Sequence, residues 1–236
     1  MDLSKYDGKH VRVTDTQGNV FTGCGTYLSS EYCLHKYGAG EDGVLVEGYP
    51  VYASGIASIQ EIGTCGTAEL PTERLLLRRY RPEDAEDLYE YFGKDPAMFQ
   101  YSGWNPYATP EMARETVERF IVSYRDGLFY GWAIEYEDVL AGTIGAYDHK
   151  DDRIEVGLSV KRDCQRRGYA TEALKAVLRY LTEHEKISCV TAWCAPENTG
   201  SKKAMEKAGM RLVKTEKGSL AIGDNVYDKL IYEYRK

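Results

Sequence analysis

The stretch RIEVGLSVKRDCQRRGYATEALKAVLRYL, residues 153–181, restricts the fold because a strand, a tight turn and a helix follow one another directly. Apolar and polar residues alternate up to Val160, which predicts a strand. From Ala170 onward, apolar residues recur at steps of three and one, which predicts an amphipathic helix. The turn between them holds Gln165 and Gly168. This part of the chain is therefore predicted to mix α and β structure.

The turn at residues 165–171 has the features of an anion-binding site. Gly168 lets the backbone come close to a ligand, and the amides from Arg166 through Thr171 can point at one anion at the start of the helix. Arg166 and Arg167 would add positive charge at its rim, so the two phosphates of a pyrophosphate would fit. The sequence has neither G-x-x-x-x-G-K-[ST] nor G-x-G-x-x-G after a strand, which excludes the two common phosphate loops. An ordinary junction between loop and helix is the alternative for these residues taken alone.

Glycine and proline punctuate the segment GTCGTAELPTERL, residues 63–75, and we predict that the chain divides there. The predicted parts are a domain at 1–66, a linker at 67–71 and a second domain at 72–236. In the second domain, helices are expected to begin at Pro82 and Pro110, because proline followed by acidic residues suits a first helical turn. Strands are predicted at RLLLRRY, FYGWAIEYE, LAGTIGAYD, RIEVGLSV and SCVTAWCA, and a last helix in NTGSKKAMEKAG precedes a final hairpin at 211–235.

The first domain is predicted to be all β. KHVRVTDTQGNVFTG, residues 9–23, alternates on both sides of a turn at 17–19 and reads as a hairpin, and further short strands follow in residues 43–62. No segment before Gly66 has a helical period. A short domain with this many strands would close into a small barrel to protect its edges. The spacing of Gly18 and Gly23 around Phe21, together with VEGYPVYASGIASI, resembles a Sm-like or SH3-like barrel.

RNA binding by this barrel is not expected. Glu47 and Gly48 stand where a Sm barrel has Arg-Gly or Lys-Gly for RNA contact, and residues 1–66 hold four Lys and Arg against eight Asp and Glu. The net charge of the whole chain is −7, which argues against non-specific binding of nucleic acid and is compatible with cationic or amine-bearing substrates.

Metal and membrane roles are not expected either. The six cysteines form no C-x-x-C pair and there is no H-E-x-x-H, so we predict free thiols and no metal. No apolar run is long enough to cross a membrane, and MDLSKYDGKH has no signal-peptide core, so we expect a cytoplasmic protein.

Several blocks, taken in order, resemble the GNAT acetyltransferase superfamily. A strand, a Q-x-x-G-x-A turn, a helix, a further strand and then Asn198 match the acyl-CoA site of that superfamily. TERLLLRRYRPEDAEDLY, RIEVGLSV, RRGYATEAL and ENTGSKKAMEKAGM resemble the ribosomal-protein N-acetyltransferase branch, which is RimJ/RimL-like, and together they cover about residues 72–235. The resemblance implies an α/β GNAT fold, with a mixed and mostly antiparallel sheet flanked by helices.

The resemblance also implies a donor, an acceptor and a binding site. The donor would be acetyl-CoA and the acceptor a primary amine, either a protein N-terminus or a small polyamine or aminoglycoside. The strand EVGLSV would diverge from its neighbour, so that its free backbone groups pair with the pantetheine arm. An amide near Leu158 or Ser159 would polarise the thioester carbonyl, as an oxyanion hole does. The implied cofactor-binding residues are Leu158, Ser159, Val160, Gln165, Arg166, Arg167, Gly168, Tyr169, Ala170, Thr171 and Asn198.

Two protons must move in amine acetylation, because the amine loses one to attack and the thiolate gains one on leaving. Glu155, on the strand beside the predicted cleft, corresponds to a glutamate that serves as base in many members of the superfamily, and the alternative is a solvated carboxylate. Ser201 matches the serine of the N-x-x-S block and is a candidate acid, with an ordinary serine at a helix start as the alternative. Tyr227 and Tyr232 on the final strand compete for that role.

The connection YSGWNPYATP, residues 101–110, would wall the acceptor pocket in this superfamily. Tyr101, Trp104 and Tyr107 could stack on a substrate or enclose it, and packing aromatics are the alternative. A second class of function stays open: a regulatory protein that holds CoA as a sensor without turnover while the barrel docks a partner. For the barrel we expect oligomerisation, docking of a substrate protein and RNA contact, in that order, which leaves a homodimer open.

Overall fold

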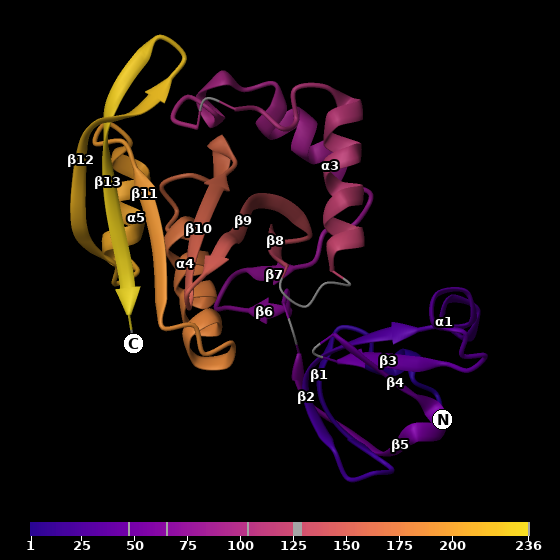
Figure 1. Ribbon diagram of the computed structural model, residues 1–236. Coiled ribbons are helices and arrows are strands. Elements are labelled where there is room, and N and C mark those ends of the chain that lie inside the picture. The colour runs from indigo at the N-terminus through magenta and orange to yellow at the C-terminus, as the bar shows by residue number, and fades with distance from the viewer. Residues whose placement is uncertain (47, 65, 103, 125–128, 236) are drawn as a thin grey trace. The chain divides into compact units, whose positions relative to one another are not determined.

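The computed structural model describes residues 1–46, 48–64, 66–102, 104–124 and 129–235 (Figure 1). The chain forms two compact units. The first comprises Met1–Ala68 together with Val122–Phe129, and the second comprises Glu69–Ile121 together with Tyr130–Lys236. Within the described ranges, no helix has both the length and the apolar character needed to cross a membrane.

The first unit contains a five-stranded antiparallel sheet in the order β4-β3-β2-β1-β5. The predicted hairpin at 17–19 joins β1 to β2 and places Val13 opposite Phe21, while the carboxylate of Asp15 accepts the amides of the turn. The strand pairs among the described residues do not include β4 with β5, so closure into a barrel stays a prediction. The strands are β1 (Lys9–Asp15), β2 (Val20–Leu28), β3 (Gly43–Val46), β4 (Tyr49–Tyr52) and β5 (Ile56–Thr64).

Valines from several strands form the core of this unit, because the alternation of apolar residues sends one face of each strand inward. The completely buried members are Leu3, Val11, Val13, Val44 and Val46. Two short 3-10 turns, Ser4–Tyr6 and Ala53–Gly55, accompany the sheet.

The first unit also has a helix, so the all-β prediction was wrong there. Helix α1 (Ser30–Tyr37) begins where the hydroxyl of Ser29 accepts the amide of Tyr32 at 3.3 Å, and it ends at Gly38 with φ 74°. Its one buried residue is Cys33. A helix that buries a single side chain has almost no apolar period, so the only sequence signals for it are its capping residues, Ser29 and Gly38.

The second unit is built on an eight-stranded sheet in the order β12-β13-β11-β10-β9-β8-β7-β6, in which β10 and β11 run parallel and the other neighbours antiparallel. This is the mixed α/β architecture that the sequence predicts. The strands are β6 (Leu70–Pro71), β7 (Leu76–Arg78), β8 (Tyr130–Tyr136), β9 (Val139–Lys150), β10 (Arg153–Val160), β11 (Cys189–Cys194), β12 (Arg211–Ile222) and β13 (Asn225–Arg235).

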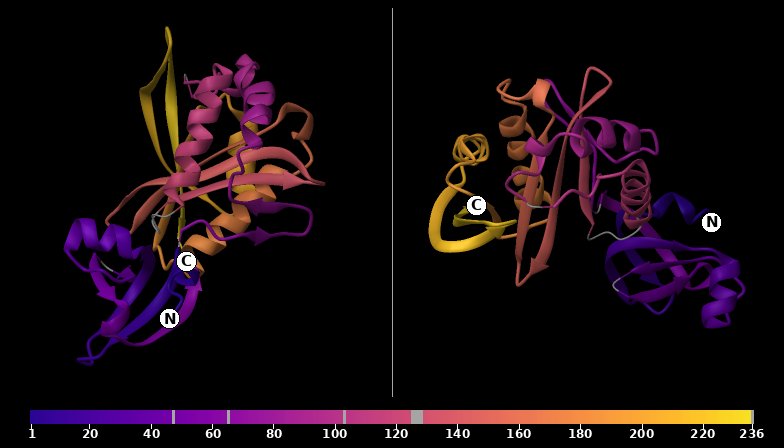
Figure 2. Two further views of the ribbon diagram at one scale, coloured as in Figure 1. Left: turned by 90° about the vertical axis from the view of Figure 1, so that its right-hand side faces the viewer. Right: turned by 90° about the horizontal axis from the view of Figure 1, so that it is seen from above.

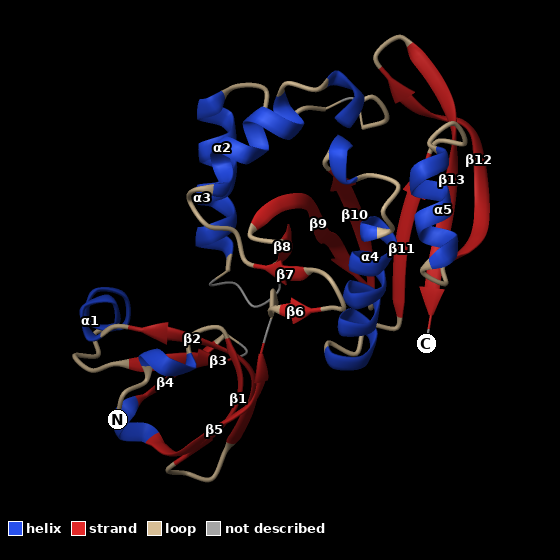
Figure 3. Ribbon diagram, turned by 180° about the vertical axis from the view of Figure 1, so that it is seen from behind, coloured by secondary structure: helices blue, strands red, loops and turns tan. Residues whose placement is uncertain are grey.

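Helices cover both faces of this sheet. Helices α2 and α3 lie on one side and α4 and α5 on the other, as the view from above shows (Figure 2, right). The helices are α2 (Asp84–Leu88), which continues into a π-helical turn at Tyr89–Gly93, α3 (Pro110–Ser123), α4 (Tyr169–Arg179), which continues into a π-helical turn at Tyr180–His184, and α5 (Thr199–Lys207) (Figure 3). Short 3-10 turns occupy Pro96–Met98 and Arg162–Cys164.

Packing of α4 against β10 fixes the segment that the sequence singles out. The apolar stripe predicted for this helix is buried at Ala173, Leu174, Val177, Leu178 and Leu181. On the same sheet, β8 is buried from Tyr130 to Glu135, as a central strand should be. The strand–turn–helix segment is thus held on a rigid base.

A buried ion network joins β7, β8 and the start of α2. The guanidinium of Arg78, only 4% exposed, donates to both carboxylate oxygens of Asp84 at 2.8 Å and also bonds Glu135. Because each charge in this network has a partner, its burial does not leave an isolated ion.

Candidate active site

Strands β10 and β11 separate along EVGLSV, the strand that the resemblance to the GNAT superfamily implied would diverge from its neighbour. They pair in parallel at three positions only, the last of which joins Glu155 to Thr191. The opposite edge of β10 stays paired with β9 as far as Val160. Within the described part of the chain, residues 156–159 therefore have a strand partner on one side alone. Backbone groups on the β11 side are available to a ligand that lies between the two strands.

The turn that follows β10 has an unusual backbone. Its 3-10 part is closed by bonds from the amides of Cys164 and Gln165, and then Arg166 has φ 62° and Gly168 has φ 87°. The first helical bond of α4 runs from the amide of Glu172 to the carbonyl of Gly168. The six amides from 166 to 171 have no acceptor within the described ranges. Left-handed residues followed by a helix start make a concave set of N–H donors that suits an anion.

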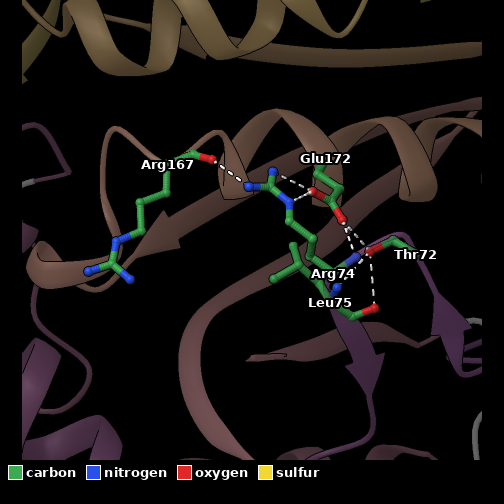
Figure 4. Close-up of polar contacts among 5 residues, drawn as sticks. All are labelled: Thr72, Arg74, Leu75, Arg167 and Glu172. Carbon is green, nitrogen blue, oxygen red and sulfur yellow. Dashed lines mark hydrogen bonds and ion pairs between the residues drawn. The ribbon is translucent and has the colours of Figure 1, made fainter. Parts of the chain in front are cut away.

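Side chains from three directions hold this turn. The side-chain Nε2 of Gln165 donates to the carbonyl of Val160 at 3.1 Å, which ties the turn to the end of β10. Arg162 forms two hydrogen bonds, of 2.7 and 2.6 Å, with Asp95 after α2, and these bonds lower the pKa of that carboxyl. On the third side, Arg74 reaches the carbonyl of Arg167 (Figure 4).

The two arginine side chains of the turn carry positive charges that no described carboxylate neutralises. Arg166 and Arg167 are exposed, and neither forms an ion pair with any described residue. Tyr169 offers only its amide, because its ring is buried between Tyr136, with centroids 5.0 Å apart, and the guanidinium of Arg74.

Glu155 lies at the point where the two strands part. Trp193 on β11 donates its indole N–H to the Glu155 carboxylate at 2.8 Å. On the other side, Glu155 is paired with Tyr147 of β9, and the pKa of the Tyr147 hydroxyl is raised by burial and by the Glu155 charge. The sequence analysis missed both partners, although the alternation of SCVTAWCA places Trp193 on one face of a strand.

A cavity of about 350 Å³ opens beside Glu155. The ammonium of Lys229 lies 4.8 Å from the centroid of the Trp193 ring, so this wall already holds a cation against an aromatic face. The cavity is lined by Asp148, Lys150, Asp151, Arg153, Ile154, Glu155, Thr191, Trp193, Lys229 and Ile231.

The predicted residues after β11 lie at the start of α5. The side-chain oxygen of Asn198 accepts the backbone N–H of Ser201 at 3.1 Å and so caps the helix. The side-chain Nδ2 of Asn198 is left to donate to a ligand. The Ser201 hydroxyl is half-buried and forms no hydrogen bond with the described residues. It can therefore donate to a ligand.

The structure separates the two candidate tyrosines of β13. Tyr227 is half-buried, and its ring meets that of Tyr101 edge to face at 6.1 Å. Tyr232 is completely buried, and its hydroxyl donates to Glu206 of α5. Burial raises the pKa of Tyr232 to about 12.

The three aromatic residues predicted to wall the acceptor pocket have different surroundings. Tyr101 joins the final hairpin through Tyr227, and the Trp104 side chain is 66% exposed. Tyr107 packs edge-on against Phe92 at 6.4 Å, and burial of its hydroxyl raises its pKa to about 12. Tyr101 and Trp104 are therefore the two with a surface to offer. Residue 103, between them, lies outside the described residues.

Comparisons with known proteins agree with this geometry. Residues 74–211 match the acetyltransferase (GNAT) domain family. The N-acetyltransferase YnaD of Bacillus subtilis, itself uncharacterized, is 30% identical over 172 residues, which are 69% of this chain and 94% of that protein. YoaA of the same organism, likewise uncharacterized, is 28% identical over 171 residues, covering 71% of this chain and 96% of that protein.

Solved structures give the same result. A GNAT-family acetyltransferase from Bacillus anthracis superposes with a TM-score of 0.64 at 27% identity, over 71% of this chain and 98% of that one. RimL, a ribosomal L7/L12 α-N-protein acetyltransferase solved with coenzyme A, has a TM-score of 0.66 at 18% identity, over 71% of this chain and 98% of that one. At that identity the likeness to RimL concerns the fold alone.

Proposed function

This chain belongs to the GNAT acetyltransferase family, and on that basis we propose that it transfers the acetyl group of acetyl-CoA to a primary amine by direct attack. The observation that carries the proposal is the turn at 166–171, where six amides have no acceptor within the described ranges and two exposed arginines are free of ion pairs there. A pyrophosphate is a ligand that suits such a set of donors.

The residues along the path from turn to strand fit the rest of a CoA molecule. The unpaired edge of β10 at Leu158 and Ser159 would bond the amides of the pantetheine arm, and one of these N–H groups would stabilise the oxyanion that forms on the thioester carbonyl. Val160 contributes less, because its carbonyl already accepts from Gln165. Asn198 would donate its side-chain N–H from the start of α5, which follows β11. Acetyl-CoA supplies the acyl group when it is bound.

The proton leaves the amine through Glu155 in this proposal. An amine has a pKa of about 8 at a protein N-terminus and about 10 in a polyamine, so its protonated form must lose a proton before it attacks. The Glu155 carboxylate is oriented by Trp193 and lies at the edge of the cavity, directly or one water away from an entering amine. The N–C bond forms, the C–S bond breaks, and the thiolate takes a proton from Ser201 or Tyr227. That hydroxyl then regains a proton from solvent, to which Glu155 releases the proton of the amine. Ser201 is favoured because it lies in the first turn of α5, next to Asn198, which is proposed to contact the pantetheine arm.

We propose a protein N-terminal amine as the acceptor, with a polyamine or an aminoglycoside as the other candidates. A related structure from Salmonella typhimurium, at 17% identity, is described as modifying the N-terminal serine of ribosomal protein L7/L12. In this scheme the domain at 72–236 carries out the reaction in the cytoplasm, and the domain at 1–66 serves oligomerisation or docks the substrate protein.

Release of the CoA thiol tests the proposal. Acetyl-CoA is mixed with the protein and one of three amines: a peptide with a free N-terminus, spermidine or an aminoglycoside. An Nα-blocked copy of the peptide is the matched control. We expect thiol release that requires the free amine, and a mass increase of one acetyl group on that amine. Binding of acetyl-CoA without thiol release from any amine would overturn the proposal and favour a CoA sensor.

A further inference from the structure

Arg74 connects the start of the second unit to the turn after β10 (Figure 4). Its Nε and Nη2 donate to one carboxylate oxygen of Glu172, at 2.8 and 2.6 Å, and its Nη1 donates to the carbonyl of Arg167 at 2.9 Å. The guanidinium also lies over the ring of Tyr169, 4.9 Å from its centroid. Three nitrogens and one face of this guanidinium are therefore used to hold residues 167–172.

Glu172 fixes Arg74 in return. Its second carboxylate oxygen accepts the hydroxyl of Thr72 at 2.7 Å and the backbone amide of Arg74 at 2.9 Å. The hydroxyl of Thr72 in turn accepts the amide of Leu75 at 2.9 Å, which closes a tight turn around Arg74. Burial raises the pKa of Glu172, but the bonds from Thr72 and Arg74 lower it more, so the group stays ionised. These hydrogen bonds fix the backbone of residues 72–75, from which the Arg74 side chain extends.

The bond to the Arg167 carbonyl sets the direction of an N–H group in the turn. In a trans peptide the C=O and the following N–H point in opposite directions. When Arg74 holds the carbonyl of Arg167, the N–H of Gly168 must face away from Arg74. That N–H is one of the six amides without an acceptor among the described residues.

The ion pair also removes an unfavourable charge. Glu172 lies in the first turn of α4, close to the proposed pyrophosphate, where a free carboxylate would repel the ligand. Arg74 compensates this carboxylate and leaves the charges of Arg166 and Arg167 for the phosphates.

We infer that Arg74 is a positioning residue for the pyrophosphate of CoA: it orients the Gly168 N–H through the Arg167 carbonyl without touching the ligand itself. The inference rests on the proposed function, since it concerns the same turn. It assigns a role in donor binding to a residue that lies 93 positions before the carbonyl it holds.

Two acetyl donors test this role. Arg74→Lys keeps the charge, but a lysine cannot form the fork to Glu172 and also reach the Arg167 carbonyl. For acetyl-CoA we expect KM, and the Kd for CoA by calorimetry, to rise about 10- to 100-fold, while kcat at saturation stays within about threefold. S-acetylpantetheine lacks the pyrophosphate, so its kcat/KM is expected to change less than about threefold.

Controls separate this inference from the proposed function. Arg114→Lys alters an exposed, ion-paired arginine of α3 and is expected to leave every constant unchanged. If the wild-type protein does not bind CoA, the proposed function is overturned. If it binds and Arg74→Lys binds equally well, the inference is overturned. An equal loss with acetyl-CoA and S-acetylpantetheine would also overturn it, because it would show a general structural role.

Discussion

Replacing Glu155 with glutamine removes the proposed base and preserves the shape of the side chain. A glutamine oxygen can still accept the indole N–H of Trp193, and the turn at 165–171 and the open edge of β10 are untouched. General-base catalysis is worth about 10²- to 10⁴-fold, so kcat should fall by that factor, which is about 3–5 kcal/mol of activation free energy. KM for acetyl-CoA should stay within about twofold, because no donor to CoA is lost.

The pH dependence of Glu155→Gln gives the sharper assay. As pH rises toward and past the amine pKa, about 8 for a protein N-terminus and about 10 for a polyamine, more of the acceptor is already deprotonated and the base matters less. The ratio of wild-type to variant kcat should therefore shrink between about pH 7 and 9.5 in stopped-time thiol-release measurements. Glu118→Gln, on the exposed face of α3, is the matched control and should behave as wild type. A variant within about threefold of wild type throughout this range would refute the role of Glu155 as base.

Three further outcomes follow from the packing and charges. Gly93→Ala should lower the melting temperature by several degrees in thermal unfolding, because the Cβ of the new alanine would overlap the carbonyl oxygen of Tyr107 and such overpacking costs about 1–3 kcal/mol. The control is Gly40→Ala, which has open space around it and should leave the melting temperature unchanged. Tyr101→Ala should raise KM for the amine several-fold but not KM for acetyl-CoA, and an unchanged amine KM would remove Tyr101 from the acceptor site. The folded protein holds the pKa of Glu172 below its ordinary value of 4.5, so the ionised carboxylate contributes its full stabilisation above pH 4.5 and loses it as the pH falls through the lowered pKa. In urea unfolding between about pH 6 and 3, the free energy of unfolding should therefore fall less in Glu172→Gln than in wild type.

The strand, turn and helix around Gly168 were predictable because their signals are local. The period changes from two to between three and four within a few residues, and glycine stands where the backbone has φ 87°. The separation of β10 from β11 came from the resemblance and not from any residue in the strand. The register shows it directly, since pairing stops at Glu155 and Thr191.

The parts that sequence reasoning missed depend on contacts between distant residues or on very few residues. Arg74 and Glu172 are 98 positions apart, and each alone looks like a surface charge. Trp193 could be placed on a strand, but its bond to Glu155 depends on the parallel pairing of β10 and β11. Helix α1 was missed because Cys33 is the one residue it buries.

Titration of CoA by calorimetry into wild type and Gly168→Glu tests the central claim most directly. The substitution places a carboxylate at the turn, and Gly168→Ala reproduces its backbone strain at φ 87° without the charge. We predict micromolar binding by wild type, a modest loss in Gly168→Ala and binding at least about 100-fold weaker in Gly168→Glu. Binding of equal strength by wild type and Gly168→Glu would show that CoA does not use this turn, and the account of the site would be wrong.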